Sequence, residues 1–486
     1  MKKKSVLITI IFSCLCIFCA SSCFWVVHHW PSLTVEQFFY HLRYPIENAS
    51  KNIIFKYILF NVGVLFLTIC VHLVGVYRIK KGYLKIKKYK IIVNIISLGL
   101  LGLNIVYTLN RINCYDFILG RYCKSNFIEE NYVNPSDIEI VAPQKKRNLI
   151  YIFMESMEVT YAGKKNGGGF DEDYIPELEE LALTYEDFSS DRKSLNGAEP
   201  LPGTTWTMGG IFAQYSGLPL KTSFEMNSQD LENGFFNNII TLGDILENQG
   251  YNQMLLLGSS AKFAGKDIFF KNHGAHMLED YNSAIEQGYI DASYYRWWGY
   301  EDLKLFEIAK DKTEYLYSLK QPFCLTILTA DTHAEDGYFC QQCLSRYDNQ
   351  YANVIACSSR QVSEFVKWIQ QEPFYKNTTI VLSGDHLTMD SDFCLNTDKE
   401  YSRKTFVSYI NSCNQVEDVK KARIYSEMDL FPTTVASLGF KIEGNRLGLG
   451  TNLFSKEETL LEKYGYDYLN KELKKKSSFM LKLENN

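Results

Sequence analysis

The chain has 486 residues and a net charge of −5 at pH 7, and its length exceeds that of one ordinary domain. The charge is unevenly divided, because residues 1–111 carry 14 basic and two acidic side chains and the remainder has a net charge of −17. A basic N-terminal segment joined to an acidic globular part argues against nucleic acid as a partner. We assign the positive charge to a membrane anchor.

Three apolar stretches in the N-terminal part are each about 20 residues long, which is enough for a helix to cross a bilayer. They are Ser5–Val27, Tyr57–Tyr77 and Ile91–Leu109. The segment Arg78–Lys90 between the last two has seven basic residues and no acidic one, so the positive-inside rule places it and the N-terminus in the cytoplasm. We therefore predict a multi-pass protein of the cell (inner) membrane whose globular part is periplasmic or extracellular. A cleaved signal peptide at the start is the disfavoured alternative, because Ala20-Ser21-Ser22 is a poor cleavage site.

The remaining chain divides into three predicted regions. Residues 112–147 are a connector, residues 148–455 a catalytic domain, and residues 456–486 a charged tail that either returns to the membrane surface or forms a solvated helix. In the catalytic domain short apolar runs alternate with helical patterns, which predicts an α/β domain with a mainly parallel sheet sandwiched by helices. The expected strands are Asn148–Met154, Asn252–Leu257, Cys324–Ala330 and Thr379–Ser383, and the expected helices are Thr241–Gln249, Leu303–Lys320 and Gln350–Gln371.

Acidic and histidine residues follow three of these strands. Glu155 follows the first, His333 stands just beyond the third, and Asp385 with His386 follows the fourth. Ligands of open α/β sheets bind just outside the carboxyl ends of the strands. Because carboxylate oxygens and imidazole suit divalent zinc or manganese, we expect Glu155, Asp385 and His386 to share one metal ion.

A nucleophile is expected in the glycine-rich and hydroxyl-rich segment Leu201–Leu220. Thr207 would open a helix over Met208–Tyr215, and a helix N-terminus favours bound phosphate through its free N–H groups and its dipole. An ordinary N-cap threonine is the alternative interpretation.

Several motifs in order along residues 148–454 resemble the alkaline-phosphatase-like and sulfatase-like superfamily. Within it, they are similar to the membrane enzymes of the phosphoglycerol transferase I and lipoteichoic acid synthase group. No single motif is specific to this superfamily. The shared order of the motifs over about 300 residues is specific to it. The motifs are Asn148…Met154-Glu155-Ser156, Gly203-Thr-Thr-Trp-Thr207 with Gly217-Leu-Pro219, Phe263-Ala-Gly-Lys266-Asp267, Leu328-Thr-Ala-Asp-Thr-His333-Ala334, Leu382-Ser-Gly-Asp385-His386-Leu387, Asp429-Leu-Phe-Pro-Thr433 and Gly448-Leu-Gly450.

The resemblance implies roles for individual residues. The three metal ligands would be joined by a threonine that is both fourth ligand and nucleophile. Thr207 is preferred because it stands about ten residues before the Gly217 turn, and Thr205 is the alternative. Lys266 would bind the substrate phosphate, although the family often has arginine there. His333 would hold the phosphate or move the leaving-group proton.

The implied activity is transfer of phosphoglycerol from phosphatidylglycerol to an extracytoplasmic glycan through a phosphothreonine-type intermediate, with release of diacylglycerol. The implied metal is Mn²⁺, with Zn²⁺ or Mg²⁺ as alternatives. A phosphoethanolamine transferase and a non-catalytic membrane protein that binds glycan or lipid are the competing hypotheses. A true sulfatase is disfavoured, because neither threonine stands in a Cys/Ser-x-Pro-x-Arg arrangement. Asp331 is left outside the catalytic set, and Trp298 is interpreted as a packing residue.

The chain has 13 cysteines, of which eight lie beyond the apolar stretches. An extracytoplasmic location favours disulfides. We expect a local bridge between Cys114 and Cys123, and bridges from the Cys340–Cys343 pair to Cys357 or Cys394.

Overall fold

The computed structural model describes residues 2–30, 33–43, 51–221, 235–390, 392–417 and 421–485. The chain forms two compact units. One comprises Met1–Val35 and Ala49–Ile118, and the other comprises Glu36–Asn48 and Leu119–Asn486.

The first unit contains three long helices, α1 (Lys2–His29), α3 (Lys51–Lys80) and α4 (Ile86–Arg111). All three are long and apolar enough to cross a membrane, and each contains one of the predicted stretches. Helix α1 packs against both of the others, and the hydroxyls of Ser13 and Ser97 are 2.7 Å apart between α1 and α4. Small hydroxyl side chains of this kind join helices where water is absent. The predicted membrane anchor is confirmed as three apolar helices.

In the described part of the second unit, the central element is a seven-stranded sheet with strand order β3-β8-β7-β2-β6-β4-β5. The strands from β7 to β5 are parallel, while β8 and β3 are antiparallel to their neighbours. The predicted mainly parallel sheet is therefore confirmed. Its strands are β2 (Asn148–Met154), β3 (Gly197–Ala198), β4 (Asn252–Leu257), β5 (Met277–Glu279), β6 (Phe323–Leu328), β7 (Thr378–Gly384) and β8 (Thr405–Ile410).

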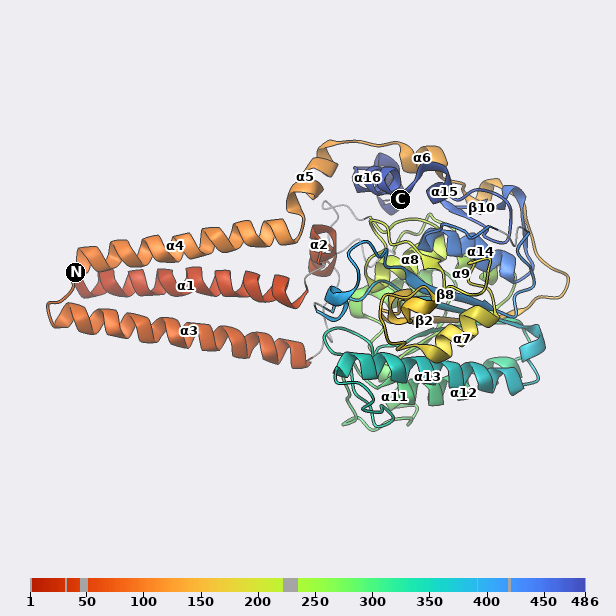
Figure 1. Cartoon of the computed structure of the whole chain (residues 1–486), viewed down its shortest axis with the longest axis horizontal. Helices are drawn as coiled ribbons and strands as arrows, with labels where there is room; N and C mark the ends of the chain where they lie inside the picture. The colour runs from red at the N-terminus through yellow and green to blue at the C-terminus, as the bar shows by residue number, and fades with distance from the viewer. Residues whose placement is uncertain are drawn as a thin grey trace. The chain divides into compact units, whose positions relative to one another are not determined.

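Helices cover both faces of this sheet, and Figure 1 shows α11, α12 and α13 on the face opposite α8, α9 and α14. Strand β2 is buried on both faces, which explains why its sequence is a continuous apolar run. Its Tyr151 and Phe153 enter one core, and Ile152 and Met154 enter the other. The helices are α7 (Pro176–Thr184), α8 (Thr207–Ser216), α9 (Leu242–Glu247), α10 (Lys266–Asn272), α11 (Tyr281–Glu286), α12 (Asp302–Ser318), α13 (Gln350–Gln371) and α14 (Leu430–Ser437).

Segments outside the predicted domain also contribute to the core of this unit. Leu469, Leu473 and Met480 of the C-terminal tail and Tyr40 of the segment between the first two membrane helices are buried in it. The helices of these segments are α2 (Val35–Arg43), α5 (Cys114–Tyr122), α6 (Phe127–Asn131), α15 (Leu460–Tyr464), α16 (Tyr466–Lys474) and α17 (Ser478–Asn485). Two short antiparallel pairs complete the unit, β1 (Ile140–Val141) with β9 (Lys441–Ile442), and β10 (Arg446–Leu447) with β11 (Gly450–Thr451).

The predicted disulfides are wrong, because all 13 cysteines lie among the described residues and all are free. Cys114 begins α5 and Cys123 follows its end. A helical rise over that interval separates them by about 13 Å, well beyond the reach of a disulfide. Cys340, Cys343 and Cys357 do lie together but are not bonded, and Cys394 packs in a different core.

A buried carboxyl makes the stability of this unit pH-dependent. Glu427 is fully buried and accepts hydrogen bonds from Thr204 Oγ1 at 3.1 Å and from Thr405 Oγ1 at 3.5 Å. Burial raises its pKa from 4.5 to about 8. Between these values the folded state holds a proton that the unfolded state has lost, so the stabilisation is fully present below the lower pKa and is lost as pH rises through the higher one.

The unfolding free energy of the wild type should fall between about pH 5 and pH 8. We predict that Glu427→Gln makes this slope smaller by up to about 1.4 kcal/mol per pH unit. Thermal unfolding in detergent across this range measures the effect, with the exposed Glu400→Gln as the control. Equal slopes in the wild type and in Glu427→Gln would contradict the prediction.

Candidate metal centre

Two adjacent parallel strands deliver the acidic residues of the site. Strands β2 and β7 pair in register up to Met154 opposite Gly384, so Glu155 and Asp385 leave the sheet side by side. The Asp385 N–H donates to the Met154 carbonyl at 3.2 Å, and the Glu155 N–H donates to Thr329 Oγ1 at 2.9 Å. Backbone pairing, and not a flexible loop, therefore sets the separation of the two carboxylates.

The oxygens of Asp385 have unequal surroundings. Its Oδ1 accepts hydrogen bonds from the N–H groups of Ser156 at 2.8 Å and His386 at 2.9 Å. Its Oδ2 is buried, and among the described residues it has no hydrogen-bond partner. Burial and the neighbouring Glu155 raise the pKa of Asp385 to about 7. A buried carboxylate oxygen without a donor is costly unless a cation faces it.

His386 is oriented with one ring nitrogen toward the carboxylates. Its Nδ1 lies 2.7 Å from the Leu387 carbonyl, which fixes the proton there in the neutral ring and leaves Nε2 as an acceptor. Nε2 lies 3.4 Å from Glu155 Oε1 and 3.5 Å from Asp385 Oδ2. Burial would lower the pKa of His386, but Asp385 and Glu155 outweigh it and raise the pKa to about 10. The surroundings thus favour positive charge at this point.

Thr207 is the first residue of α8, and its hydroxyl faces the same point. Its Oγ1 lies 3.4 Å from Glu155 Oε2 and 3.3 Å from His386 Nε2. Among the described residues, Thr205 has no side-chain hydrogen bond to the three ligands, and its carbonyl accepts from Gln37 at 3.3 Å. The geometry therefore brings Thr207 to the site and not Thr205.

The donor set fits a divalent metal ion. Ligand atoms of Glu155, Asp385 and His386 all lie within 4.8 Å of one another, and all three residues are buried. Two carboxylates, one imidazole nitrogen and a hydroxyl suit manganese or zinc. Asp385 Oδ2 has no hydrogen-bond partner among the described residues and has only the His386 ring as a nearby cation, at 3.5 Å, so it is open to a metal ion.

The predicted substrate-binding residues border this centre without joining it. Lys266 is buried at the start of α10, where its Nζ donates to the Phe263 carbonyl at 2.7 Å. Burial lowers the pKa of Lys266 to about 8, against the opposing effects of Glu155, Asp267 and Asp385. The ring of His333 is half-buried, and its centroid lies 4.6 Å from the centroid of the Trp298 ring. The Trp298 centroid lies 5.5 Å from the centroid of the Phe263 ring. These side chains form a basic and aromatic border beside the ligands.

Sequence reasoning missed the residues that hold the ligands in place. Ser156 Oγ donates to Glu155 Oε1 at 2.8 Å, and Thr332 Oγ1 donates to the Glu155 carbonyl at 2.5 Å. Hydroxyl residues within a few positions of a strand end were the available signal, but that signal is common. Asp331 and Asp302 are both buried. The backbone N–H of Asp302 donates a hydrogen bond to Asp331 Oδ1 at 3.2 Å, so Asp331 stabilises a turn.

The sequence profile of the sulfatase family matches residues 147–440, which is more than half of the chain, and the chain therefore belongs to the sulfatase family. Phosphoglycerol transferase I of Salmonella choleraesuis (strain SC-B67) is 36% identical over 326 residues, which covers 64% of this chain and 40% of that protein. The same enzyme of Citrobacter koseri is 35% identical with the same coverage. The chain thus spans about two fifths of the length of these curated relatives. The resemblance found in the sequence motifs is confirmed.

A solved structure extends the likeness in fold to the membrane part. The integral membrane protein lipooligosaccharide phosphoethanolamine transferase A (EptA) from Neisseria meningitidis superposes with a TM-score of 0.51. The match covers 89% of this chain and 84% of that one, at 12% identity. It shows a shared fold.

Gly210 of α8 packs closely against the end of β7, because an added Cβ would lie 1.8 Å from the Asp385 carbonyl oxygen. We predict that Gly210→Ala pushes α8 from the strand end, costs about 1–3 kcal/mol or more in stability and weakens metal binding. Thermal unfolding and manganese titration measure both effects. Gly163→Ala is the matched control, since its Cβ would meet Asp173 at an ordinary 3.6 Å. Wild-type behaviour of Gly210→Ala would contradict the packing described.

Proposed function

We propose that the chain is a metal-dependent phosphotransferase that moves phosphoglycerol from phosphatidylglycerol to an extracytoplasmic glycan and releases diacylglycerol. The observation that carries the proposal is the Thr207 hydroxyl, which opens a helix and lies 3.3–3.4 Å from two of the three metal-ligand side chains. The curated relatives are named phosphoglycerol transferase I, and this supports the choice of transferred group.

The roles of the ligands follow from the donor set. Glu155, Asp385 and His386 would hold one divalent ion, which we propose is Mn²⁺, with Zn²⁺ and Mg²⁺ as alternatives. Such an ion, when bound, lowers the pKa of a coordinated hydroxyl and polarises a phosphoryl oxygen. Thr207 would be the fourth ligand.

Thr207 then acts as the nucleophile in a two-step transfer. Its Oγ1 attacks the phosphorus of the lipid phosphodiester, the bond from phosphorus to the diacylglycerol oxygen breaks, and phosphoglyceryl-threonine remains. His333 delivers the proton that the departing diacylglycerol oxygen needs. A glycan hydroxyl attacks the same phosphorus in the second step and gives its proton to His333, the bond from phosphorus to Thr207 Oγ1 breaks, and Oγ1 takes back from solvent the proton that it lost in the first step.

The border residues fit a phosphodiester substrate. Lys266 would supply positive charge, and both Lys266 and His333 would supply hydrogen-bond donors to the substrate. Neither lies among the three candidate metal-ligand side chains. Phosphate recognition by charge-assisted hydrogen bonds is stronger in such a buried setting than in water.

The location of the lipid donor fits the organisation of the chain. Helix α2 follows the first membrane helix in sequence, and its Gln37 donates to the Thr205 carbonyl while its Tyr40 donates to the Ala264 carbonyl at 2.7 Å. Helix α2 thus contacts both the loop before Thr207 and the loop before Lys266. The proposed protein is a membrane-embedded enzyme of the inner membrane with its catalytic domain on the periplasmic or extracellular side.

A phosphoethanolamine transferase is the second candidate, favoured by the fold shared with EptA over most of both chains. It would use the same Thr207 chemistry on a different headgroup. A non-catalytic lipid- or glycan-binding protein would not need a complete ligand set with a nucleophile beside it.

We predict that Thr207→Ala lowers phosphatidylglycerol turnover by about 10³-fold or more, because it removes the nucleophile. Mass spectrometry of the protein after incubation with phosphatidylglycerol and Mn²⁺ should find a phosphoglyceryl adduct on Thr207, together with released diacylglycerol. Thr205→Ala is the matched control and should keep both.

An adduct that survives in Thr207→Ala would contradict the assigned nucleophile. An adduct formed only from phosphatidylethanolamine would replace the proposed donor by the second candidate. Absence of any adduct and any diacylglycerol with both lipids would contradict the enzymatic proposal.

A further inference from the structure

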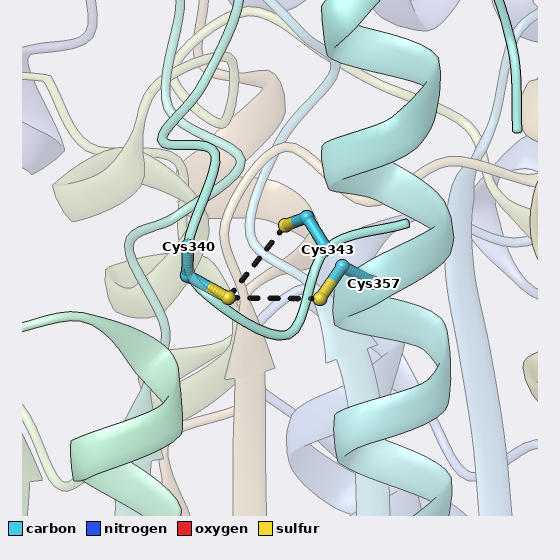
Figure 2. A group of neighbouring side chains, drawn as sticks. All are labelled: Cys340, Cys343 and Cys357. Atoms are coloured by element: carbon cyan, nitrogen blue, oxygen red, sulfur yellow. Dashed lines mark hydrogen bonds between the residues drawn. The ribbon is translucent and has the colours of Figure 1, made fainter. Parts of the chain in front are cut away.

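Three buried cysteines converge outside the candidate metal centre. Cys340 and Cys343 lie on the loop between β6 and α13, and Cys357 lies on α13 itself (Figure 2). The Sγ atom of Cys340 lies 3.7 Å from that of Cys357 and 3.6 Å from that of Cys343. All three sulfurs lie within 4.8 Å of one another.

We propose that Cys340, Cys343 and Cys357 bind a thiophilic divalent metal ion, for which zinc is the natural choice, at a structural site separate from the Glu155, Asp385 and His386 centre. In a tetrahedral site with Zn–S bonds of about 2.3 Å, neighbouring sulfurs stand about 3.8 Å apart. The two distances from Cys340 match that separation. Cys-x-x-Cys followed by a third cysteine from a helix is also a usual zinc-ligand spacing.

Side-chain donors surround two of the three sulfurs. Gln361 Nε2 donates to Cys357 Sγ at 3.1 Å and lies 3.6 Å from Cys340 Sγ. The Arg360 guanidinium donates to Cys357 Sγ at 3.3 Å. Three thiolates and one divalent ion would carry a net charge of −1, which the Arg360 cation neutralises.

The turn of the Cys-x-x-Cys segment adds further donors to one sulfur. The backbone N–H groups of Gln342 and Cys343 donate to the Cys340 sulfur. Several N–H groups directed at one cysteine sulfur are the outer hydrogen bonds that stabilise a metal thiolate.

A fourth ligand is available in the Gln361 amide. Its Oε1 is buried and, within the described ranges, has no hydrogen-bond partner. Oxygen and nitrogen of a side-chain amide exchange places by a half-turn. That half-turn directs Oε1 at the sulfurs and replaces the hydrogen bonds from Nε2 to Cys357 and Cys340, so Gln361 serves either as an outer donor or as the fourth ligand, without movement of the backbone.

A disulfide accounts for the arrangement less well. Cys340 is nearly equidistant from two partners, and pairing with either would leave the third thiol unpaired among buried groups. A metal ion uses all three sulfurs at once.

The site would hold the loop that carries His333. That loop begins at the end of β6, where Thr332 accepts a hydrogen bond from Tyr351 of α13 at 2.7 Å through its carbonyl and contacts Glu155 through its hydroxyl. The cysteines fix the far part of the same loop to the same helix, and Arg360 adds a hydrogen bond to the Gln342 carbonyl at 2.6 Å. A bound metal would thus limit the positions open to His333.

Cobalt substitution tests the proposal, because sulfur ligands give Co²⁺ an intense near-ultraviolet charge-transfer band that oxygen and nitrogen ligands do not. Full-length protein, purified in detergent under reducing conditions and stripped of metal, is titrated with Co²⁺. We expect the band in the wild type and in Glu155→Gln, which disables only the other centre. We expect loss of the band in Cys340→Ser and retention in Cys413→Ser, whose cysteine is exposed and is not part of the three-cysteine group.

Metal analysis of untreated wild-type protein keeps the proposal testable if Cys340→Ser fails to fold. It should find about one zinc ion per wild-type chain, and this ion should be absent from Cys343→Ser. Absence of the band in the wild type, its persistence in Cys340→Ser, or peptide mapping that shows a disulfide between any two of the three cysteines would overturn the proposal.

Discussion

The parallel pairing of β2 with β7 is the constraint on which the candidate centre depends. Register up to Met154 and Gly384 makes Glu155 and Asp385 neighbours in a buried place where two carboxylates repel each other. Positive charge relieves that repulsion; His386 supplies part of it, and the proposed divalent ion would supply the rest. The sheet thus places a candidate cation site at its edge, and α8 brings Thr207 to the same point.

The main features of the fold and the convergence of the candidate ligands were predictable because they follow from local sequence. Apolar runs ending in acidic residues predict buried parallel strands, and strands that share a sheet edge bring their terminal residues together. Glu155, Asp385 and His386 meet for this reason. The helix that begins at Thr207 was predictable from its glycine-rich segment.

Other parts depend on contacts between residues distant in sequence, which periodicity does not reveal. The pairing of Asp302 with Asp331 and the burial of Tyr40 and the C-terminal helices are of this kind. The disulfide predictions failed because cysteine spacing does not reveal whether a helix such as α5 holds two cysteines apart. The convergence of Cys357 on Cys340 and Cys343 required the position of α13 against its preceding loop.

The distribution of charge along the chain matches the separate roles proposed for its two parts. The basic N-terminal part forms three apolar helices, and the acidic remainder forms the sulfatase-family domain. Within that acidic domain, Lys266 and the proposed metal ion would place positive charge near one hydroxyl. A phosphodiester, which is anionic and attached to a membrane lipid, suits both halves of this arrangement.

The central claim is that Glu155, Asp385 and His386 hold one divalent ion against the Thr207 hydroxyl. Anomalous diffraction from crystals of the full chain soaked in Mn²⁺ tests it most directly. The account predicts a manganese peak at bonding distance from all three side chains and from Thr207 Oγ1, about 2.0–2.3 Å for each ligand. A vacant centre at saturating Mn²⁺, or an ion bound there with Thr207 turned away, would contradict the account.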